Sequence, residues 1–170
     1  EGEDLILDRI FGGRSDGFYI DIGAHHPKRF SNTYKFYLKG WRGINIDALP
    51  GTKALFDKVR PSDINLELGI SKSRAELIYY SFNEPALNTF KKSEAENKNG
   101  KNGYFIKNEI KLKTLPLSDV LYQHLPVDVK IDFMTVDVEG LDIEVLESND
   151  WTKYRPEYIL VEELRTDIEQ

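Results

Sequence analysis

The chain of 170 residues contains no cysteine, and this absence removes several kinds of chemistry at once. A disulfide framework, a thiolate metal site and a cysteine nucleophile are all excluded. A chain of this length can bury a core large enough to be stable without cross-links, so we expect residues 1–170 to form a single domain. The N-terminus shows no basic-then-apolar segment of the secretory type, which together with the lack of cysteine predicts a cytoplasmic protein.

Surplus positive charge and long apolar runs are missing as well. The formal net charge is -6, from 23 Lys and Arg residues against 29 Asp and Glu residues. A protein that binds nucleic acid through its phosphates usually carries a basic surplus, so we expect no nucleic-acid partner. The longest apolar runs are far too short to cross a bilayer, which predicts that there is no transmembrane segment.

Short apolar, β-rich runs alternate with helical patterns along the chain. Buried strands are predicted in the stretches GFYIDIGA, RGINIDA, IDFMTVDVEG and PEYILVEE, and a further strand in INLELGIS. Amphipathic helices are predicted in EDLILDRIFGG, NTYKFYLKG, GTKALFDKV, LSDVLYQHL and LDIEVLES. Because strand and helix alternate, the strands should pair in parallel through right-handed crossovers and form an open α/β sheet.

The middle of the chain is less regular than its two ends. AELIYYSF and EIKLKTL read as two further strands, the second of them half-exposed. Between them, the second half of NEPALNTFKKSEAENKNGKNG is rich in lysine, asparagine and glycine and has few apolar residues. We therefore predict a mobile surface loop there.

Acids and glycines stand where the predicted strands end. Because ligands of open parallel sheets bind beyond the carboxyl ends of the strands, these residues predict a binding site. A structural explanation stays open for each of them, since carboxylates also favour the N-termini of helices. The strand ends carry Asp21 and Gly23, Asp47, Gly69 and Ser71, Asp137, Glu139 and Gly140, and Glu162 and Glu163.

The spacing of the first two acids indicates the kind of ligand. Asp21 and Asp47 are 47 - 21 = 26 positions apart, close to the interval at which a βαβ nucleotide site places the acid that binds a ribose diol. The phosphate-binding patterns are absent, because GAHHPK has one glycine where GxGxxG needs three. A ribose acid without a phosphate cradle suits a nucleoside that carries no phosphate, and S-adenosylmethionine is the commonest such ligand.

Several motifs together resemble one known family, the FkbM-type S-adenosylmethionine-dependent methyltransferases. They are FYIDIGAHHPKRFSNTYKFYLKGWRGINIDALPG, ELGIS, LPLSDVL, IDFMTVDVEGLDIEVLES and EYILVEE. The resemblance implies a Rossmann-like class I methyltransferase fold, a mostly parallel twisted sheet with helices on both faces. It also implies O-methylation of a hydroxyl on a sugar or small natural product, so the partner would be a small-molecule or glycan acceptor. The C-terminal hairpin usual in this fold has no counterpart after PEYILVEE, so we expect a domain truncated at its C-terminus or an exposed sheet edge.

The resemblance also assigns residues to the cofactor. Asp21, Gly23 and Ala24 would frame its methionine part, and Asp47 would hold the ribose hydroxyls. Ala48 would lie beside the adenine, with the backbone of Leu68, Gly69 and Ile70 on its other side. Ser31, Asn32 and Thr33 would shape the floor of the pocket, and Asp137 and Glu139 would stand nearest the methyl group and the acceptor.

Methylation of a hydroxyl also needs a base. His25 and His26 are the first candidates, because histidine titrates near neutrality, and Asp137 and Glu139 are the second. The two histidines would instead cap backbone groups if the loop were purely structural. A metal-assisted reaction is a further alternative, in which Asp137, Glu139 and Glu162 would bind Mg²⁺ or Ca²⁺.

Two other functions compete with a methyltransferase. A nucleotide-sugar-processing enzyme would need the phosphate-binding glycine loop that this chain lacks, and a non-catalytic domain with the same fold would have lost the cofactor site. Beside the predicted loop, Tyr79, Tyr80 and Phe82 are candidates to stack on a sugar ring.

Overall fold

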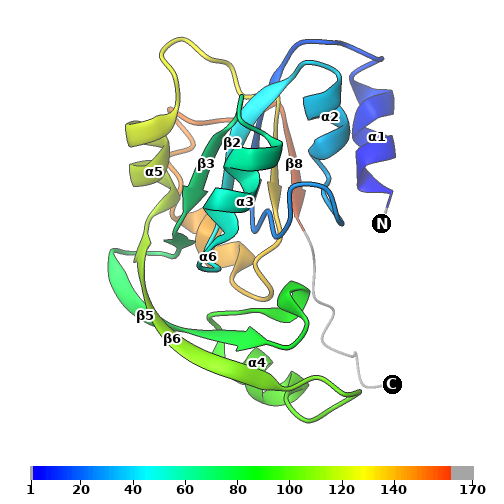
Figure 1. Ribbon diagram of the computed structural model, residues 1–170. Helices are drawn as coiled ribbons and strands as arrows, with labels where there is room; N and C mark the ends of the chain where they lie inside the picture. The colour runs from blue at the N-terminus through cyan, green and yellow to red at the C-terminus, as the bar shows by residue number, and fades with distance from the viewer. Residues whose placement is uncertain (1, 162–170) are drawn as a thin grey trace, which may run out of the picture.

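Five parallel strands form the central sheet of the computed structural model, which describes residues 2–161 (Figure 1). The strand order is β3-β2-β1-β7-β8, so the direction of winding reverses between β1 and β7. In such a sheet the crevice at the reversal is where ligands bind. The strands are β1 (Phe18–Ile22), β2 (Arg42–Asp47), β3 (Ile64–Glu67), β7 (Phe133–Val136) and β8 (Tyr158–Val161).

Helices cover both faces of this sheet, and the two faces bury different side chains. On one face, alternate aliphatic residues such as Ile20, Ile44 and Met134 pack against α5 and α6. On the other face, Tyr19 and Phe133 pack against aromatic residues of and around α1 and α2. The helices are α1 (Glu3–Ile10), α2 (Tyr34–Leu38), α3 (Thr52–Val59), α5 (Leu117–His124) and α6 (Asp142–Glu147). The predicted Rossmann-like α/β fold is therefore confirmed.

A second sheet lies at the end of the central sheet to which the strand arrows point (Figure 1). It has the order β4-β6-β5, with β5 and β6 antiparallel and β4 and β6 parallel. Its strands are β4 (Gly69–Ile70), β5 (Ala75–Phe82) and β6 (Ile106–Leu115), and the segment between β5 and β6 carries the short helices η1 (Pro85–Leu87) and α4 (Lys92–Lys98).

Two predictions in this region are wrong. The stretch INLELGIS is not one strand, because Leu68 separates β3 of the central sheet from β4 of the second sheet. The segment predicted as a mobile loop contains the helix α4, whose Ala95 is completely buried against Tyr80 and Phe82. Ala95 is a single small apolar residue, and one such residue gives the segment no hydrophobic periodicity from which a helix could be predicted.

Two further predictions concern a membrane-spanning helix and a hairpin at the C-terminus. Within residues 2–161, no helix has both the length and the apolar character that a bilayer span requires. The question of a C-terminal hairpin falls on residues after Val161, which lie outside the described residues.

Candidate functional site

A cavity of about 550 Å³ lies between the carboxyl ends of the central strands and the second sheet. This volume is within the range typical of small-ligand sites. Most of the residues predicted from the sequence line it: Asp21, Gly23, Ala24, His25, Ser31, Asn32, Asp47, Ala48, Leu68, Gly69, Ile70, Asp137 and Glu139. Thr33 and His26 do not line it, and Glu162 is outside the described residues. Tyr79 of β5, together with Asn88 and Phe90 from the segment between β5 and β6, completes the wall.

Close packing explains two glycines of this wall. Gly23 has φ +80°, and a Cβ added to it would lie 1.7 Å from the backbone oxygen of Asp137. Only glycine allows β1 and β7 to end this close together. A Cβ on Gly69 would lie 2.6 Å from Phe90 Cζ, so glycine at this position of β4 leaves room for the Phe90 ring.

Asp47 ends β2 with a carboxylate that is already partly hydrogen-bonded. Its Oδ2 accepts from the backbone N–H of His25 at 2.8 Å, and its Oδ1 accepts from that of Leu49 at 2.8 Å. Burial raises the pKa of Asp47, and these two hydrogen bonds oppose the rise. Thr52 Oγ1 lies 3.4 Å from Oδ1, but it donates its proton to the Leu49 carbonyl at 2.6 Å. Because a carboxylate oxygen can accept two hydrogen bonds, each oxygen can still accept one from a hydroxyl of a ligand.

Asp21 is the most deeply buried acid of the cavity, with 6% of its surface exposed. Its Oδ2 accepts a hydrogen bond from Thr33 Oγ1 at 2.5 Å. Burial raises the pKa of Asp21 to about 6, against 3.8 for an ordinary aspartate. A buried carboxylate with this pKa is a strong site for a cationic group of a ligand.

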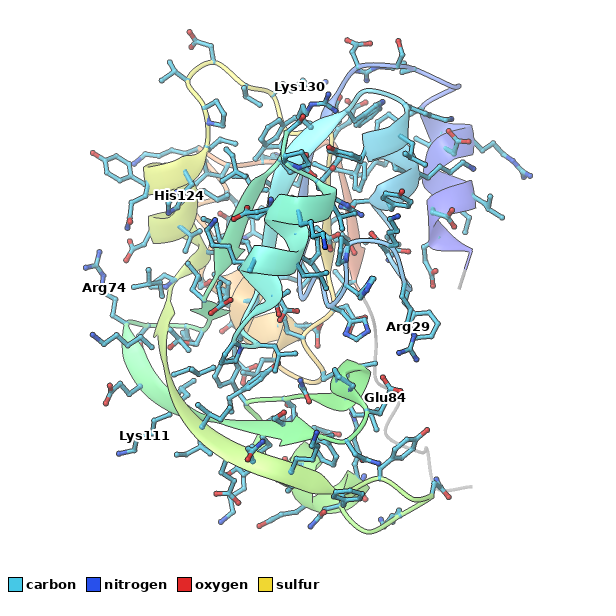
Figure 2. All side chains as sticks on the ribbon, viewed as in Figure 1. Arg29, Arg74, Glu84, Lys111, His124 and Lys130 are labelled. Carbon is cyan, nitrogen blue, oxygen red and sulfur yellow. The ribbon has the colours of Figure 1, made fainter. Side chains whose placement is uncertain are left out.

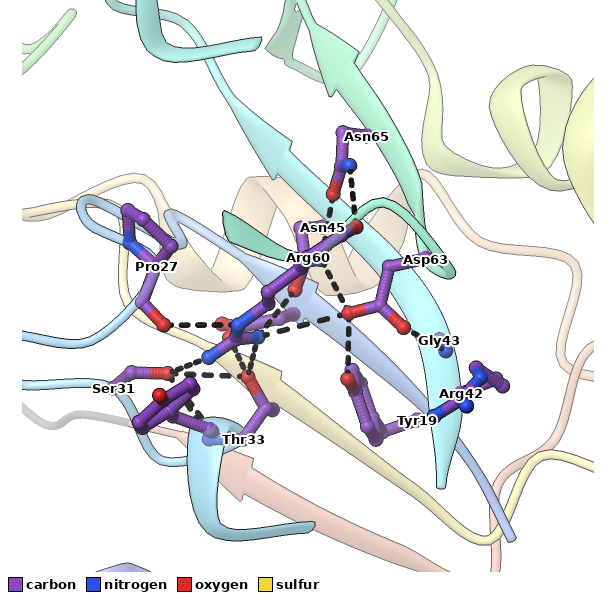
Figure 3. A network of polar contacts seen from close by, with 12 residues as sticks. Tyr19, Pro27, Ser31, Thr33, Arg42, Gly43, Asn45, Arg60, Asp63 and Asn65 are labelled. Carbon is purple, nitrogen blue, oxygen red and sulfur yellow. Dashed lines mark hydrogen bonds and ion pairs between the residues drawn. The ribbon is translucent and has the colours of Figure 1, made fainter. Parts of the chain in front are cut away.

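Arg60 holds the loop that carries Pro27, Ser31 and Thr33, as Figure 3 shows. It is completely buried and donates to the Pro27 carbonyl at 2.9 Å, to Thr33 Oγ1 at 2.8 Å and to Ser31 Oγ at 2.6 Å. Thr33 therefore supports the cavity from beneath Asp21. The sequence alone does not identify Arg60 as a buried residue. An arginine at the end of a helix has the same local sequence pattern whether its side chain is buried or exposed.

The two adjacent histidines have different surroundings. His25 lines the cavity, its Nε2 is buried without a hydrogen-bond partner, and desolvation lowers its pKa. His26 Nδ1 accepts hydrogen bonds from the backbone N–H groups of Lys28 and Arg29, each at 3.0 Å. His26 therefore caps backbone groups of the loop, which is the structural role considered for both histidines.

Backbone strain gathers around the cavity. His25, Phe30 and Glu139 have φ values of +53°, +57° and +52°, and all three line it. Such conformations cost about 1–3 kcal/mol each and are found mainly at ligand sites, and for a bulky residue such as Phe30 they are unusual. Arg29 and Glu84, labelled in Figure 2, form an ion pair at 3.3 Å that joins the strained loop to the start of η1.

The loop after β7 is braced from both sides. The Asp142 carboxylate accepts from the backbone N–H groups of Val138 and Gly140 at 3.0 and 3.1 Å. From the segment between β5 and β6, Thr89 Oγ1 donates to the Glu139 carbonyl at 2.8 Å, and Lys98 of α4 forms an ion pair with the Glu139 carboxylate. The segment that carries α4 thus helps to fix Glu139 at the cavity.

Two alternatives concern a metal ion and a sugar. Across residues 2–161, no group of three or more His, Asp and Glu side chains is arranged to hold a metal ion, and Glu162 of the predicted ligands lies outside this range. Of the three aromatic residues considered for sugar stacking, only Tyr79 faces the cavity, because Tyr80 and Phe82 pack against α4.

Comparison with known proteins identifies the family. The model of the methyltransferase FkbM domain matches residues 21–169. The chain belongs to the FkbM methyltransferase family. Neither the curated proteins nor the solved structures that were compared with the chain gave a match. The matched FkbM domain begins at Asp21 in β1 and includes the second sheet, and membership in a methyltransferase family implies S-adenosylmethionine as the cofactor.

Proposed function

We propose that this FkbM methyltransferase uses S-adenosylmethionine to methylate a hydroxyl group of a sugar or small natural product. The observation that carries the proposal is the pair of acids in one cavity, Asp21 from β1 and Asp47 from β2, at the point where strand order reverses. This arrangement suits a ligand with a ribose diol at one end and an ammonium group at the other.

The cavity residues fit this cofactor by their chemistry. Asp47 retains acceptor capacity for two ribose hydroxyls, and Ala48, Leu68, Gly69 and Ile70 line the same cavity and would border the adenine. Asp21 offers a buried negative charge to the α-ammonium group, which lowers the free energy of the bound state most where water is excluded. Ser31 and Asn32 line the same end.

His25 is the base in this proposal. The cofactor supplies an electrophilic methyl group, and the acceptor oxygen must lose its proton as it takes that group. Burial lowers the pKa of His25, so the imidazole is neutral at pH 7 and able to accept the proton. Asp137, at the end of β7, is the second candidate.

An exposed aromatic residue at the cavity supports a sugar as the acceptor. Phe30 lines the cavity and has 62% of its surface exposed, and the Arg29 guanidinium lies 4.5 Å from its ring centroid. A ring held open to solvent in a strained conformation is suited to pack against the flat face of a sugar.

The two histidines give a matched test of the base. Asparagine tolerates positive φ and, at position 26, its Oδ1 can replace Nδ1 as acceptor of the loop N–H groups. In an assay of S-adenosylhomocysteine release with a panel of glycosides, His25→Asn should lower kcat by about 10²-fold or more, with cofactor affinity unchanged. His26→Asn should keep kcat within about twofold of the wild type. Equal kcat in both variants would remove His25 from the base role.

A further inference from the structure

The second sheet places a tyrosine beside the acid of the ribose site. Tyr79 of β5 lines the cavity with 6% of its surface exposed, whereas Tyr80 on the same strand packs toward α4. The Tyr79 ring packs against Phe90 with 4.7 Å between ring centroids, and Phe90 in turn fits against Gly69. Because Phe90 is seated against Gly69 of β4, the Tyr79 ring is held near the strand that directly follows β3.

Next to Tyr79 lies a buried amide that has an unused donor. Asn88 lines the cavity, is 8% exposed, and its Oδ1 accepts from the backbone N–H of Phe82 at 2.8 Å. This bond sets the orientation of the amide, and its Nδ2 is buried with no hydrogen-bond partner. A buried donor without a partner destabilises the folded protein, so its retention calls for an explanation.

The Tyr79 hydroxyl lies within the electrostatic influence of both neighbours. Burial raises the pKa of Tyr79, the Asp47 carboxylate raises it further, and the Asn88 amide opposes the rise. The hydroxyl therefore keeps its proton at any pH at which the protein works, and it remains a hydrogen-bond donor.

On the basis of the proposed function, we propose that Tyr79 recognises the ribose of the cofactor together with Asp47. A ribose hydroxyl that donates to Asp47 still has lone pairs on its oxygen, and Tyr79 Oη donates to one of them. Asn88 Nδ2 then donates to Tyr79 Oη, which gives the orphaned amide its partner and completes a chain from Asn88 to Asp47. Such a chain discriminates against nucleosides that lack this hydroxyl.

Tyr79→Phe tests the role of the Tyr79 hydroxyl, because it retains the ring contact to Phe90. Binding of S-adenosylhomocysteine, adenosine, 2′-deoxyadenosine and 3′-deoxyadenosine would be titrated calorimetrically against the wild type, Tyr79→Phe and the control Tyr80→Phe. The control removes a hydroxyl from the same strand on the face turned away from the cavity. Thermal unfolding of each variant checks that the fold is intact.

Tyr79→Phe should weaken binding of S-adenosylhomocysteine by about 3- to 10-fold, the effect of one neutral hydrogen bond. It should also reduce the preference for adenosine over one of the two deoxyadenosines by a similar factor, while Tyr80→Phe changes neither. Unchanged affinity in Tyr79→Phe, or a loss equal for adenosine and both deoxy forms, would overturn the role of Tyr79 and leave the proposed function intact. Failure of the wild type to bind S-adenosylhomocysteine would overturn the proposed function, and this inference with it.

Discussion

Replacement of Asp21 by asparagine should stabilise the folded protein at neutral pH. Burial raises the pKa of Asp21 to about 6, whereas the same group in the unfolded chain titrates near 3.8. Between these pH values the folded state binds more protons than the unfolded state, so stability falls as pH rises. Above pH 6 the Asp21 carboxyl is ionised in both states, and the destabilisation caused by its buried charge is constant. Below pH 3.8 both are protonated and it vanishes.

The size of the effect follows from the two pKa values. A difference of about two pKa units corresponds to about 3 kcal/mol at pH 7.5, and to roughly half of that at pH 5. Asparagine keeps an acceptor for Thr33 Oγ1 and carries no charge. Asp21→Asn should therefore exceed the wild type in free energy of unfolding by up to about 3 kcal/mol at pH 7.5, and the gap should narrow by about 1.5 kcal/mol at pH 5.

Urea unfolding followed by tryptophan fluorescence at pH 5, 6 and 7.5 would measure this gap. Asp128→Asn is the control, since it removes a carboxylate from an exposed turn where φ is +60°, a conformation that asparagine tolerates. The same Asp21→Asn variant should bind S-adenosylmethionine more weakly, because the ammonium group loses its counter-charge. A gap independent of pH, or a variant less stable than the wild type at pH 7.5, would refute the reasoning.

Three further predictions concern the cavity. Asp47→Asn should weaken S-adenosylmethionine binding at least about tenfold in calorimetry, because one charge-assisted hydrogen bond to ribose contributes about 1.5–3 kcal/mol; unchanged affinity would remove Asp47 from the ribose site. Lys98→Met should lower turnover more than cofactor affinity, because Glu139 loses an ion pair that holds its loop. The control Lys92→Met removes an exposed ion pair on the same helix and should leave turnover and affinity unchanged. Equal turnover in the two variants would show that the Lys98–Glu139 ion pair does not support the site. The acid limb of the kcat–pH profile should lie below pH 6.5, because a neutral His25 acts as base and its pKa is lowered from 6.5; a limb above that value would exclude His25.

Local patterns predicted the centre of the main sheet because β1, β2 and β7 are buried on both faces and read as nearly continuous apolar runs. The prediction that β8 is a buried strand is wrong, because most of its residues are exposed at the edge of the sheet. The ends of β1, β2 and β7 could also be predicted, because Asp21, Asp47 and Asp137 directly follow the apolar runs. That these three residues line one cavity follows from parallel pairing, which brings the carboxyl ends of all five strands to one edge.

Long-range contacts account for what the sequence analysis missed. Arg60 is buried only because its partners Pro27, Ser31 and Thr33 lie about 30 positions earlier, and no local pattern encodes that. Leu68 marks the passage from one sheet to the other inside what looks like a single strand. Tyr79 and Tyr80 have the same residue type, and strand alternation alone does not tell which of them faces the ligand.

Calorimetric titration of the wild-type protein with S-adenosylmethionine, alongside NAD, tests the central claim most directly. We expect saturable one-to-one binding of S-adenosylmethionine and no binding of NAD, because Asp21 and Asp47 line the cavity and the sequence has no phosphate-binding glycine loop. Binding of NAD in preference, or of neither nucleotide, would contradict the assignment of this cavity to a methyl-donor cofactor.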